Sequence, residues 1–148
     1  MAIVDRIQAD LVQAAKARDQ RRLSALRLIL DSLKKASKEA RGPLSEEDEI
    51  AVLRREQRRR LEAAEAYREG GRAELASGEE AESEVIAEYL PEELSDEELE
   101  GLVKDAVGET GAESVKEMGK VMAAIMPKLG GRADGKRVSA LVRERLSA

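Results

Sequence analysis

The sequence predicts an all-α protein. Apolar residues recur three and four positions apart along nearly the whole chain, as in Leu23, Leu26, Leu30 and Leu33, which is the spacing of one helix face. No stretch alternates apolar and polar residues as a half-buried strand does. Only 3 of the 148 residues are proline, and alanine, leucine, glutamate and arginine, which favour helices, are abundant.

Capping residues and glycines set the expected helix boundaries. A hydroxyl stands three residues before a carboxylate at Ser45, Ser95 and Ser114, and this pattern begins a helix. Glycines and prolines separate the periodic segments. We expect helices at residues 2–17, 20–41, 45–69, 72–90, 95–108, 114–129 and 135–146.

Four longer helices come before Pro91 and three shorter ones follow it, which predicts two domains. The first, residues 1–90, is a subdomain of long helices, and the second, residues 91–148, is a three-helix bundle. The second domain is close to the smallest size that folds alone and therefore needs a well-filled core. We expect that core to contain Leu99, Val103, Val121, Ile125, Val138 and Leu141.

The composition excludes several classes of function. Histidine, cysteine, tryptophan, phenylalanine and asparagine are all missing, so the usual general base, thiol nucleophile and transition-metal ligands are absent. We therefore predict no catalytic residue, no cofactor and no metal site. A charge at Asp5 argues against a signal peptide, and the longest apolar run, residues 121–126, is too short to span a membrane. The expected location is the cytoplasm.

Charge is unevenly distributed along the chain. The net charge is −5, but residues 1–41 carry ten basic and five acidic side chains. Residues 74–100 carry twelve acidic and no basic side chains, and residues 116–145 carry eight basic and three acidic ones. Such segregation permits electrostatic contact between the acidic middle and the basic ends of the chain. It also permits one basic face to bind a nucleic acid while an acidic face repels it.

The helix expected at 45–69 carries five arginines between residues 54 and 60. Their spacings of one and four place four of them along one side, and the guanidinium fork suits phosphate oxygens. A solvated face paired with acidic neighbours such as Glu56 and Glu62 is the alternative interpretation. The candidate anion-binding residues of this ridge are Arg54, Arg55, Arg58 and Arg59.

The segment from Gly130 to Arg137 nearly matches a nucleotide-binding P-loop. Arg137, however, stands where a magnesium-binding Ser or Thr is required, and a helix precedes the segment instead of a strand. What remains is a glycine-rich turn before a helix, where Arg132, Lys136 and the helix N-terminus can hold a phosphate. Alternatively, the two glycines end one helix and Asp134 caps the next, which leaves the cations unexplained.

An apolar stripe with three methionines runs along residues 118–129. Methionine adapts to many shapes, so the stripe suits a partner-binding surface. It also suits the core that a short three-helix unit needs in order to fold.

Three segments together resemble the YqeY family: EYLPEELS at 88–95, MGKVM at 118–122 and PKLGGRADGKRV at 127–138, with RLSALR at 22–27 in the N-terminal half. Members of that family share a domain with the tail of the GatB subunit of tRNA-dependent amidotransferases. The resemblance implies that residues 91–148 form a three-helix bundle like this tail, which helps such enzymes engage tRNA. The candidates that it implies for contact with the tRNA backbone are Lys120, Lys128, Arg132, Lys136 and Arg137.

Two functions are compatible with the sequence. The first is a non-catalytic tRNA-binding or tRNA-enzyme accessory protein that meets phosphates without reading bases. The second is a helical interaction module that docks an aminoacyl-tRNA synthetase or an amidotransferase. The family's label as a carbon–nitrogen ligase with glutamine as amido donor belongs to the catalytic part of GatB, which nothing in this sequence resembles.

Overall fold

The computed structural model describes residues 2–148, and every regular element among them is helical. The all-α prediction is therefore confirmed. The elements are α1 (Ile3–Lys16), α2 (Gln20–Ala40), α3 (Glu46–Glu69), α4 (Ala73–Ala87), α5 (Asp96–Thr110), the 3₁₀ turn η1 (Val115–Glu117), α6 (Met118–Leu129) and α7 (Gly135–Ser147).

Two of the three predicted hydroxyl caps form, and the third does not. The Ser45 hydroxyl accepts a hydrogen bond from the Asp48 amide, and that of Ser95 from the Glu98 amide, both at 3.1 Å. Ser114 makes no side-chain cap, and the chain forms the 3₁₀ turn η1 before α6 begins. Here the Glu117 carboxylate accepts the Glu113 amide at 2.6 Å, an interaction that lowers the pKa of Glu117. A helical segment thus begins directly after Ser114, but its first turn is 3₁₀ and the α-helix itself starts at Met118.

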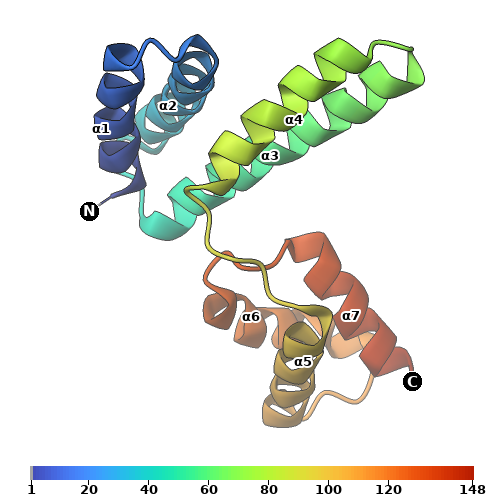
Figure 1. Ribbon diagram of the computed structural model, residues 1–148. Coiled ribbons are helices and arrows are strands. Elements are labelled where there is room, and N and C mark those ends of the chain that lie inside the picture. The colour runs from blue at the N-terminus through green and yellow to red at the C-terminus, as the bar shows by residue number, and fades with distance from the viewer. Residues whose placement is uncertain (1) are drawn as a thin grey trace. The chain divides into compact units, whose positions relative to one another are not determined.

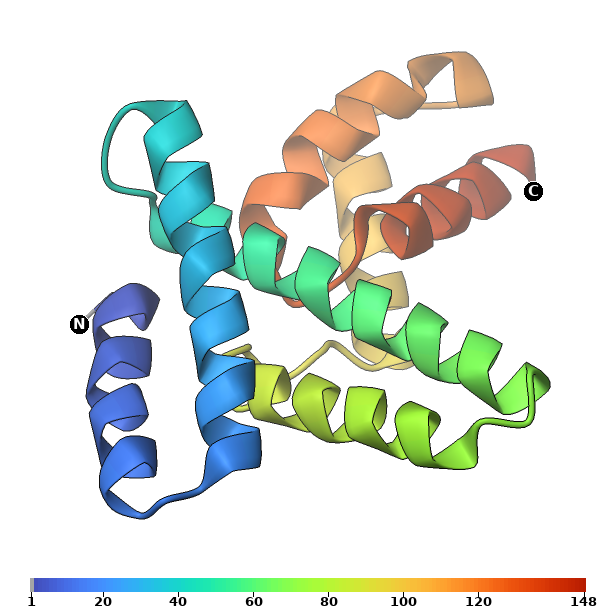
Figure 2. The same ribbon diagram turned by 90° about the horizontal axis from the view of Figure 1, so that it is seen from above.

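Contacts between Cα atoms divide the chain into two compact units, one ending at Leu90 and the other running from Pro91 to Ala148. In the first unit, α1 packs on α2, α3 packs on α4, and α2 contacts both helices of the second pair (Figures 1 and 2). Its buried core consists of Ile3, Ile7, Ala14, Leu23, Leu26, Ile29, Leu30, Leu33, Ile50, Leu53, Ile86 and Tyr89.

The N-terminus of α1 is held by a carboxylate from α3. Ala2 occupies the N-cap position and has no side chain that could cap the helix. Glu49, only 2% exposed, accepts the amides of Ile3 at 3.3 Å and Val4 at 2.8 Å. A buried carboxylate that receives two helix N-terminal amides is satisfied by hydrogen bonds and by the helix dipole. The carboxylate therefore links α1 to α3 through Val4 and Glu49, which lie 45 positions apart in sequence.

Tyr89 lies at the C-terminal end of the first unit and is part of its buried core. Its hydroxyl donates to the Asp10 carboxylate, and the Arg6 guanidinium lies 5.3 Å from the centre of its ring. Burial and the hydrogen bond to Asp10 raise the pKa of the phenol well above its ordinary value. Next to it, Glu88 pairs with Arg22 at 2.6 Å, which raises the pKa of that guanidinium.

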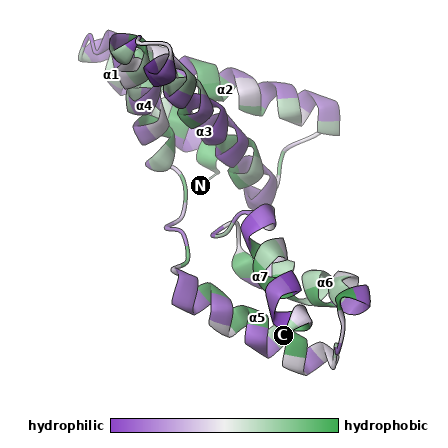
Figure 3. Ribbon diagram, turned by 90° about the vertical axis from the view of Figure 1, so that its right-hand side faces the viewer, coloured by the Kyte–Doolittle hydropathy of each residue, from purple (hydrophilic) through white to green (hydrophobic). Residues whose placement is uncertain are grey.

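The second unit packs α5, α6 and α7 around one apolar core. Five of the six predicted core residues are buried, and the sixth, Leu141, is half-buried and packs against them. The ribbon of α6 is largely hydrophobic (Figure 3). Within the methionine stripe, Val121, Ile125 and Leu129 are buried, whereas Met126 is 40% exposed. The stripe is therefore mainly core.

Candidate nucleic-acid interface

The glycine-rich turn between α6 and α7 has the capping geometry that the sequence predicted as one alternative. Gly130 ends α6 in the left-handed region with φ 56°, and Gly131 follows with φ 75°. Asp134 then caps α7 by accepting the Lys136 amide at 2.9 Å. Glycine is needed at both left-handed positions because a Cβ there is strained.

Arg132 folds back over the end of α6. Its Nε donates to the Leu129 carbonyl at 3.0 Å, and a terminal nitrogen donates to the Lys128 carbonyl at 3.3 Å. These carbonyls belong to the last turn of the helix, where no amide is available inside the helix to bond them. This capping role sets the orientation of the guanidinium.

Arg137 and the backbone of Arg132 together clamp the segment before α5. The Leu94 amide donates to the Arg132 carbonyl at 2.9 Å, and the Leu94 carbonyl accepts from Arg137 at the same distance. Arg137 also pairs with Asp96 at 2.5 Å. The two segments that carry most of the family resemblance, 88–95 and 127–138, thus bind each other through Leu94.

The three lysines among the candidates differ in how far they are engaged. Lys128 bonds both oxygens of Glu109, at 2.8 and 3.0 Å. Lys120 lies 3.8 Å from Glu117, and its side chain is 65% exposed. Lys136 is exposed, and within residues 2–148 its ammonium group makes no ion pair or hydrogen bond. Among the five predicted residues, those that remain available for an external anion are therefore chiefly Lys120 and Lys136.

The turn brings Arg132, Lys136 and Arg137 together, but it leaves Lys120 apart. Lys120 lies in the first turn of α6, and Lys128 lies two turns later. An eight-residue separation along a helix corresponds to a rise of about 12 Å. The five predicted residues thus form an extended set of cations instead of one phosphate pocket.

The arginine ridge on α3 is partly paired, as the second interpretation predicted. Glu56 is buried and pairs with Arg60 at 2.7 Å and with Arg59 at 3.4 Å. Arg60 also reaches Glu82 on α4 at 3.4 Å. Arg59 remains 64% exposed, and Arg55 is exposed without a partner among the described residues.

The other two ridge residues differ in exposure. Arg54 is half-buried, and Arg58 is exposed. Both lie in the first unit, so the ridge and the glycine turn belong to different units.

A set of cations on α2 was missed when single residues were chosen from the sequence. Arg27, Lys34, Lys35 and Lys38 are exposed on this helix. No hydroxyl, glycine or repeated motif marks them. The signal that could have found them is the excess of basic over acidic residues in positions 1–41.

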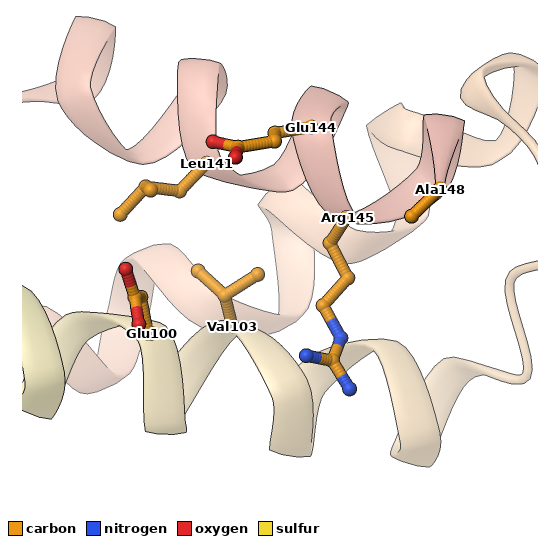
Figure 4. Close-up of a pocket in the computed structure, with 6 residues that line it drawn as sticks. All are labelled: Glu100, Val103, Leu141, Glu144, Arg145 and Ala148. Atoms are coloured by element: carbon orange, nitrogen blue, oxygen red, sulfur yellow. The ribbon is translucent and has the colours of Figure 1, made fainter.

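A shallow groove of about 530 Å³ lies between α5 and α7. Figure 4 shows Val103 and Leu141 facing each other across it, with Glu100, Glu144 and Arg145 around them. The lining contains carboxylates but no hydroxyl or lysine nucleophile next to a general base.

Residues 2–148 hold neither a membrane-spanning helix nor a cluster of metal-ligating side chains. No helix there is both long and apolar enough to cross a membrane. Nor does this part of the chain bring three or more acidic, cysteine or histidine side chains into an arrangement that could hold a metal ion.

Comparison with known proteins agrees with the motifs and the helical fold. A family model described as Yqey-like protein matches residues 4–146, nearly the whole chain. The chain belongs to the YqeY family. The clamp between residues 88–95 and 127–138 thus gives a structural role to segments by which this YqeY-family chain is recognised.

Two fungal relatives of this YqeY-family chain also match it. A Pyrenophora tritici-repentis protein named altered inheritance of mitochondria protein 41, mitochondrial, is 28% identical over 149 residues, or 99% of this chain and 82% of that protein. A Schizosaccharomyces pombe protein described as uncharacterized is 28% identical over 89 residues, or 60% of this chain and 72% of that protein. Neither name states a ligand or a reaction.

Proposed function

We propose that this YqeY-family chain is a non-catalytic accessory protein that binds tRNA, alone or together with an aminoacyl-tRNA synthetase or an amidotransferase. One observation carries the proposal. Lys120 and Lys136 present exposed ammonium groups on the three-helix unit that resembles the tail of tRNA-dependent amidotransferases. Arg132 and Arg137 hold the turn beside Lys136 through bonds to the Leu129 and Leu94 carbonyls.

Binding of this kind depends on phosphates and not on bases. The chain has no tryptophan or phenylalanine, and of its two tyrosines Tyr89 is buried. The other, Tyr67, is half-buried, and a single partly exposed ring cannot stack successive bases as single-strand binders do. Lysine contacts to phosphates release bound counterions, so the affinity falls steeply as salt rises.

The proposal assigns no amide-forming chemistry to this chain. The resemblance covers the tail of GatB and not the part that carries catalysis. The groove between α5 and α7 offers no nucleophile with a base beside it. We propose the cytoplasm as the location, while the name of one fungal relative places that protein in mitochondria.

Titration of labelled tRNA with the full chain at two or more salt concentrations tests the proposal. The test variant is Lys120→Gln/Lys136→Gln, because neither side chain holds the fold together. The control is Lys104→Gln/Arg143→Gln, which makes the same change in net charge at two exposed residues of the same unit that have no partner among the described residues.

The test variant should bind more weakly than the control, and its plot of log affinity against log salt should be shallower by about 1.5, at about 0.7–0.9 for each lost phosphate contact. Equal affinity and slope for the two variants would remove Lys120 and Lys136 from the interface. Absence of tRNA binding by the unmodified chain at 50 mM salt would overturn the proposed function itself.

The docking alternative has less support from the geometry. The first sequence feature that suggested docking, the methionine stripe, lies mainly in the core of the second unit. The second, the acidic segment 74–100, is partly engaged inside the first unit, where Glu80, Glu82 and Glu88 pair with arginines. A pull-down from nuclease-treated lysate separates the two functions, because a protein partner that persists without RNA favours docking.

A further inference from the structure

One side of α2 carries a line of cations, here named the α2 stripe: Arg27, Lys34, Lys35 and Lys38. Successive residues of an α-helix turn by about 100°. Arg27, Lys34 and Lys38 therefore lie within about 40° of one another, and Lys35 lies about 60° beyond Lys38. All four are exposed.

The α2 stripe is not neutralised by the protein's own carboxylates. Within the described part of the chain, none of its four charged groups forms an ion pair or a hydrogen bond. Arg22 of the same helix shows the contrast, since it pairs with Glu88 at 2.6 Å. By helical geometry Arg22 points roughly 140° away from Arg27. Asp31 lies within the stripe, Glu39 lies four residues after Lys35, and Asp5 lines the same hollow as Lys34, but none of them pairs with a stripe cation among the described residues.

The two ends of α2 add exposed arginines in an unusual backbone conformation. Arg18 precedes the helix with φ 58°, and Arg41 ends it with φ 60°. Glycine or asparagine normally fills such left-handed positions because a larger side chain is strained there. Both arginines are exposed, so each end of α2 adds a positive charge. With the exception of Leu28, the large apolar residues of α2 are meanwhile buried in the core of the first unit.

We propose that the α2 stripe is a second RNA-contact surface that binds the phosphates of double-helical RNA. This inference rests on the proposed function and extends it to the N-terminal unit. From Arg27 to Lys38 the helix rises about 16 Å. One strand of a B-form duplex presents a phosphate about every 3.4 Å along the helix axis, and an RNA duplex likewise presents its phosphates at regular, closely spaced intervals. Several cations of one straight helix can therefore contact one backbone at once.

The surface suits a duplex better than a membrane. A helix that lies on a lipid surface inserts a broad apolar face between the headgroups. In α2 the apolar residues Leu26, Ile29 and Leu33 are at most 1% exposed and belong to the core. Leu28, 44% exposed, is the one large apolar side chain of α2 that faces solvent. The helix therefore lacks a face that could insert.

The same surface suits a duplex better than a single strand. Recognition of flexible strands depends largely on aromatic side chains that stack on unpaired bases. None of the α2 stripe residues is aromatic, and they offer only charge in a fixed line. A rigid duplex presents phosphates at regular spacing and matches such a line without an added cost of ordering.

The test compares charge-removing variants of the full chain. The stripe variant is Arg27→Gln/Lys34→Gln/Lys38→Gln. Its control, Lys16→Gln/Lys104→Gln/Arg143→Gln, removes the same charge from three exposed cations on α1, α5 and α7. The probes are tRNA, a duplex RNA, a single-stranded RNA of equal length, and vesicles rich in phosphatidylserine.

The stripe variant should bind tRNA and the duplex at least about tenfold more weakly than the control at 50 mM salt, with a salt slope shallower by about 2. The single strand should bind more weakly than the duplex, and the vesicles should not bind. Equal binding by the stripe and control variants overturns the inference. Stripe-dependent binding of vesicles, or preference for the single strand, also overturns it.

A single substitution gives a prediction of opposite sign. Asp31→Asn removes the carboxylate within the stripe and should tighten duplex binding about two- to fivefold at low salt. Glu39→Gln removes one negative charge from the same helix, at a position about 80° around the helix axis from Asp31, and should have a smaller effect on duplex binding. Equal effects would show that net charge, and not the stripe, governs binding.

The outcomes keep this inference separate from the proposed function. When the unmodified chain binds tRNA and the stripe variant equals its control, the inference fails and the proposed function stands. When the unmodified chain binds no tRNA at 50 mM salt, both fail. Every substituted residue is exposed, so the helices of each variant should stay intact. Circular dichroism of each variant checks this.

Discussion

Replacing Arg137 by methionine separates a structural from a binding role for this residue. Methionine keeps an aliphatic side chain but removes both donors, so the Leu94 carbonyl loses its partner at 2.9 Å and Asp96 loses its partner at 2.5 Å. A hydrogen bond from an ionised group contributes about 1.5–3 kcal/mol. Arg137 is 30% exposed and Asp96 83% exposed, so solvent reduces the first contribution and leaves little for the second.

We therefore expect Arg137→Met to destabilise the C-terminal unit by about 1.5 kcal/mol. For a domain of this size such a loss lowers the melting temperature by about 6–12 °C. Amide hydrogen exchange gives a local reading, because the Leu94 amide bonds to the Arg132 carbonyl in the same clamp. Its protection should fall about tenfold.

Lys136→Met is the matched control, since it makes the same change at an exposed neighbour whose side chain has no partner within residues 2–148. It should alter stability by less than about 0.5 kcal/mol. Equal stability and equal Leu94 protection in the two variants, together with weaker tRNA binding by Arg137→Met, would refute the structural assignment and make Arg137 a binding residue.

Further predictions test the caps, the buried carboxylate and the buried phenol. Ser95→Ala should cost about 1 kcal/mol in urea unfolding, whereas Ser114→Ala should cost less than about 0.3, because only the first hydroxyl caps a helix; equal losses would contradict this. Glu49→Ala should cost about 2 kcal/mol and expose the first amides of α1 to hydrogen exchange, since it leaves both amides unpaired; unchanged exchange there would contradict the cap. The raised pKa of Tyr89 means that stability is fully present below the unfolded value of about 10 and falls as pH rises above it. Spectrophotometric titration against Tyr89→Phe should show this phenol ionising only as the protein unfolds, and ionisation in the folded state near pH 10 would be the contrary result.

Helical periodicity and capping were sufficient to predict the fold. Ser45 and Ser95 each begin a helix because the hydroxyl, the amide that it bonds and the following carboxylate all lie within four residues. The sequence at Ser114 has the same pattern, but the Ser114 hydroxyl makes no cap, and the Glu117 carboxylate bonds the backbone amides of Glu113 and Ser114. A local pattern predicts a cap only when no competing local bond forms.

The candidate site was harder to predict because charge in a sequence does not reveal its partner. The Asp96 partner of Arg137 lies 41 residues away, and the Glu109 partner of Lys128 lies 19 residues away. Glu82, which contacts Arg60, lies on the next helix. Long-range pairs of this kind depend on the packing of the helices, so the sequence alone could not show which cations stay free.

The α2 stripe is the opposite case, a group of cations that stay unpaired among the described residues. Apart from Arg27, which ends the RLSALR segment, its residues lie in no motif, and their importance depends on their sharing one exposed side of a helix that the core orients. The excess of basic residues in positions 1–41 indicated a cationic region, but burial was needed to show which of them face solvent.

The salt dependence of tRNA binding by the unmodified chain tests the central claim most directly. With phosphate contacts from Lys120, Lys136 and three residues of the α2 stripe, log affinity should fall linearly with log salt at a slope of about −3.5 to −4.5. An affinity that does not change between 50 and 200 mM salt, or no measurable binding at 50 mM, would contradict the claim that exposed cations of this chain bind RNA through its phosphates.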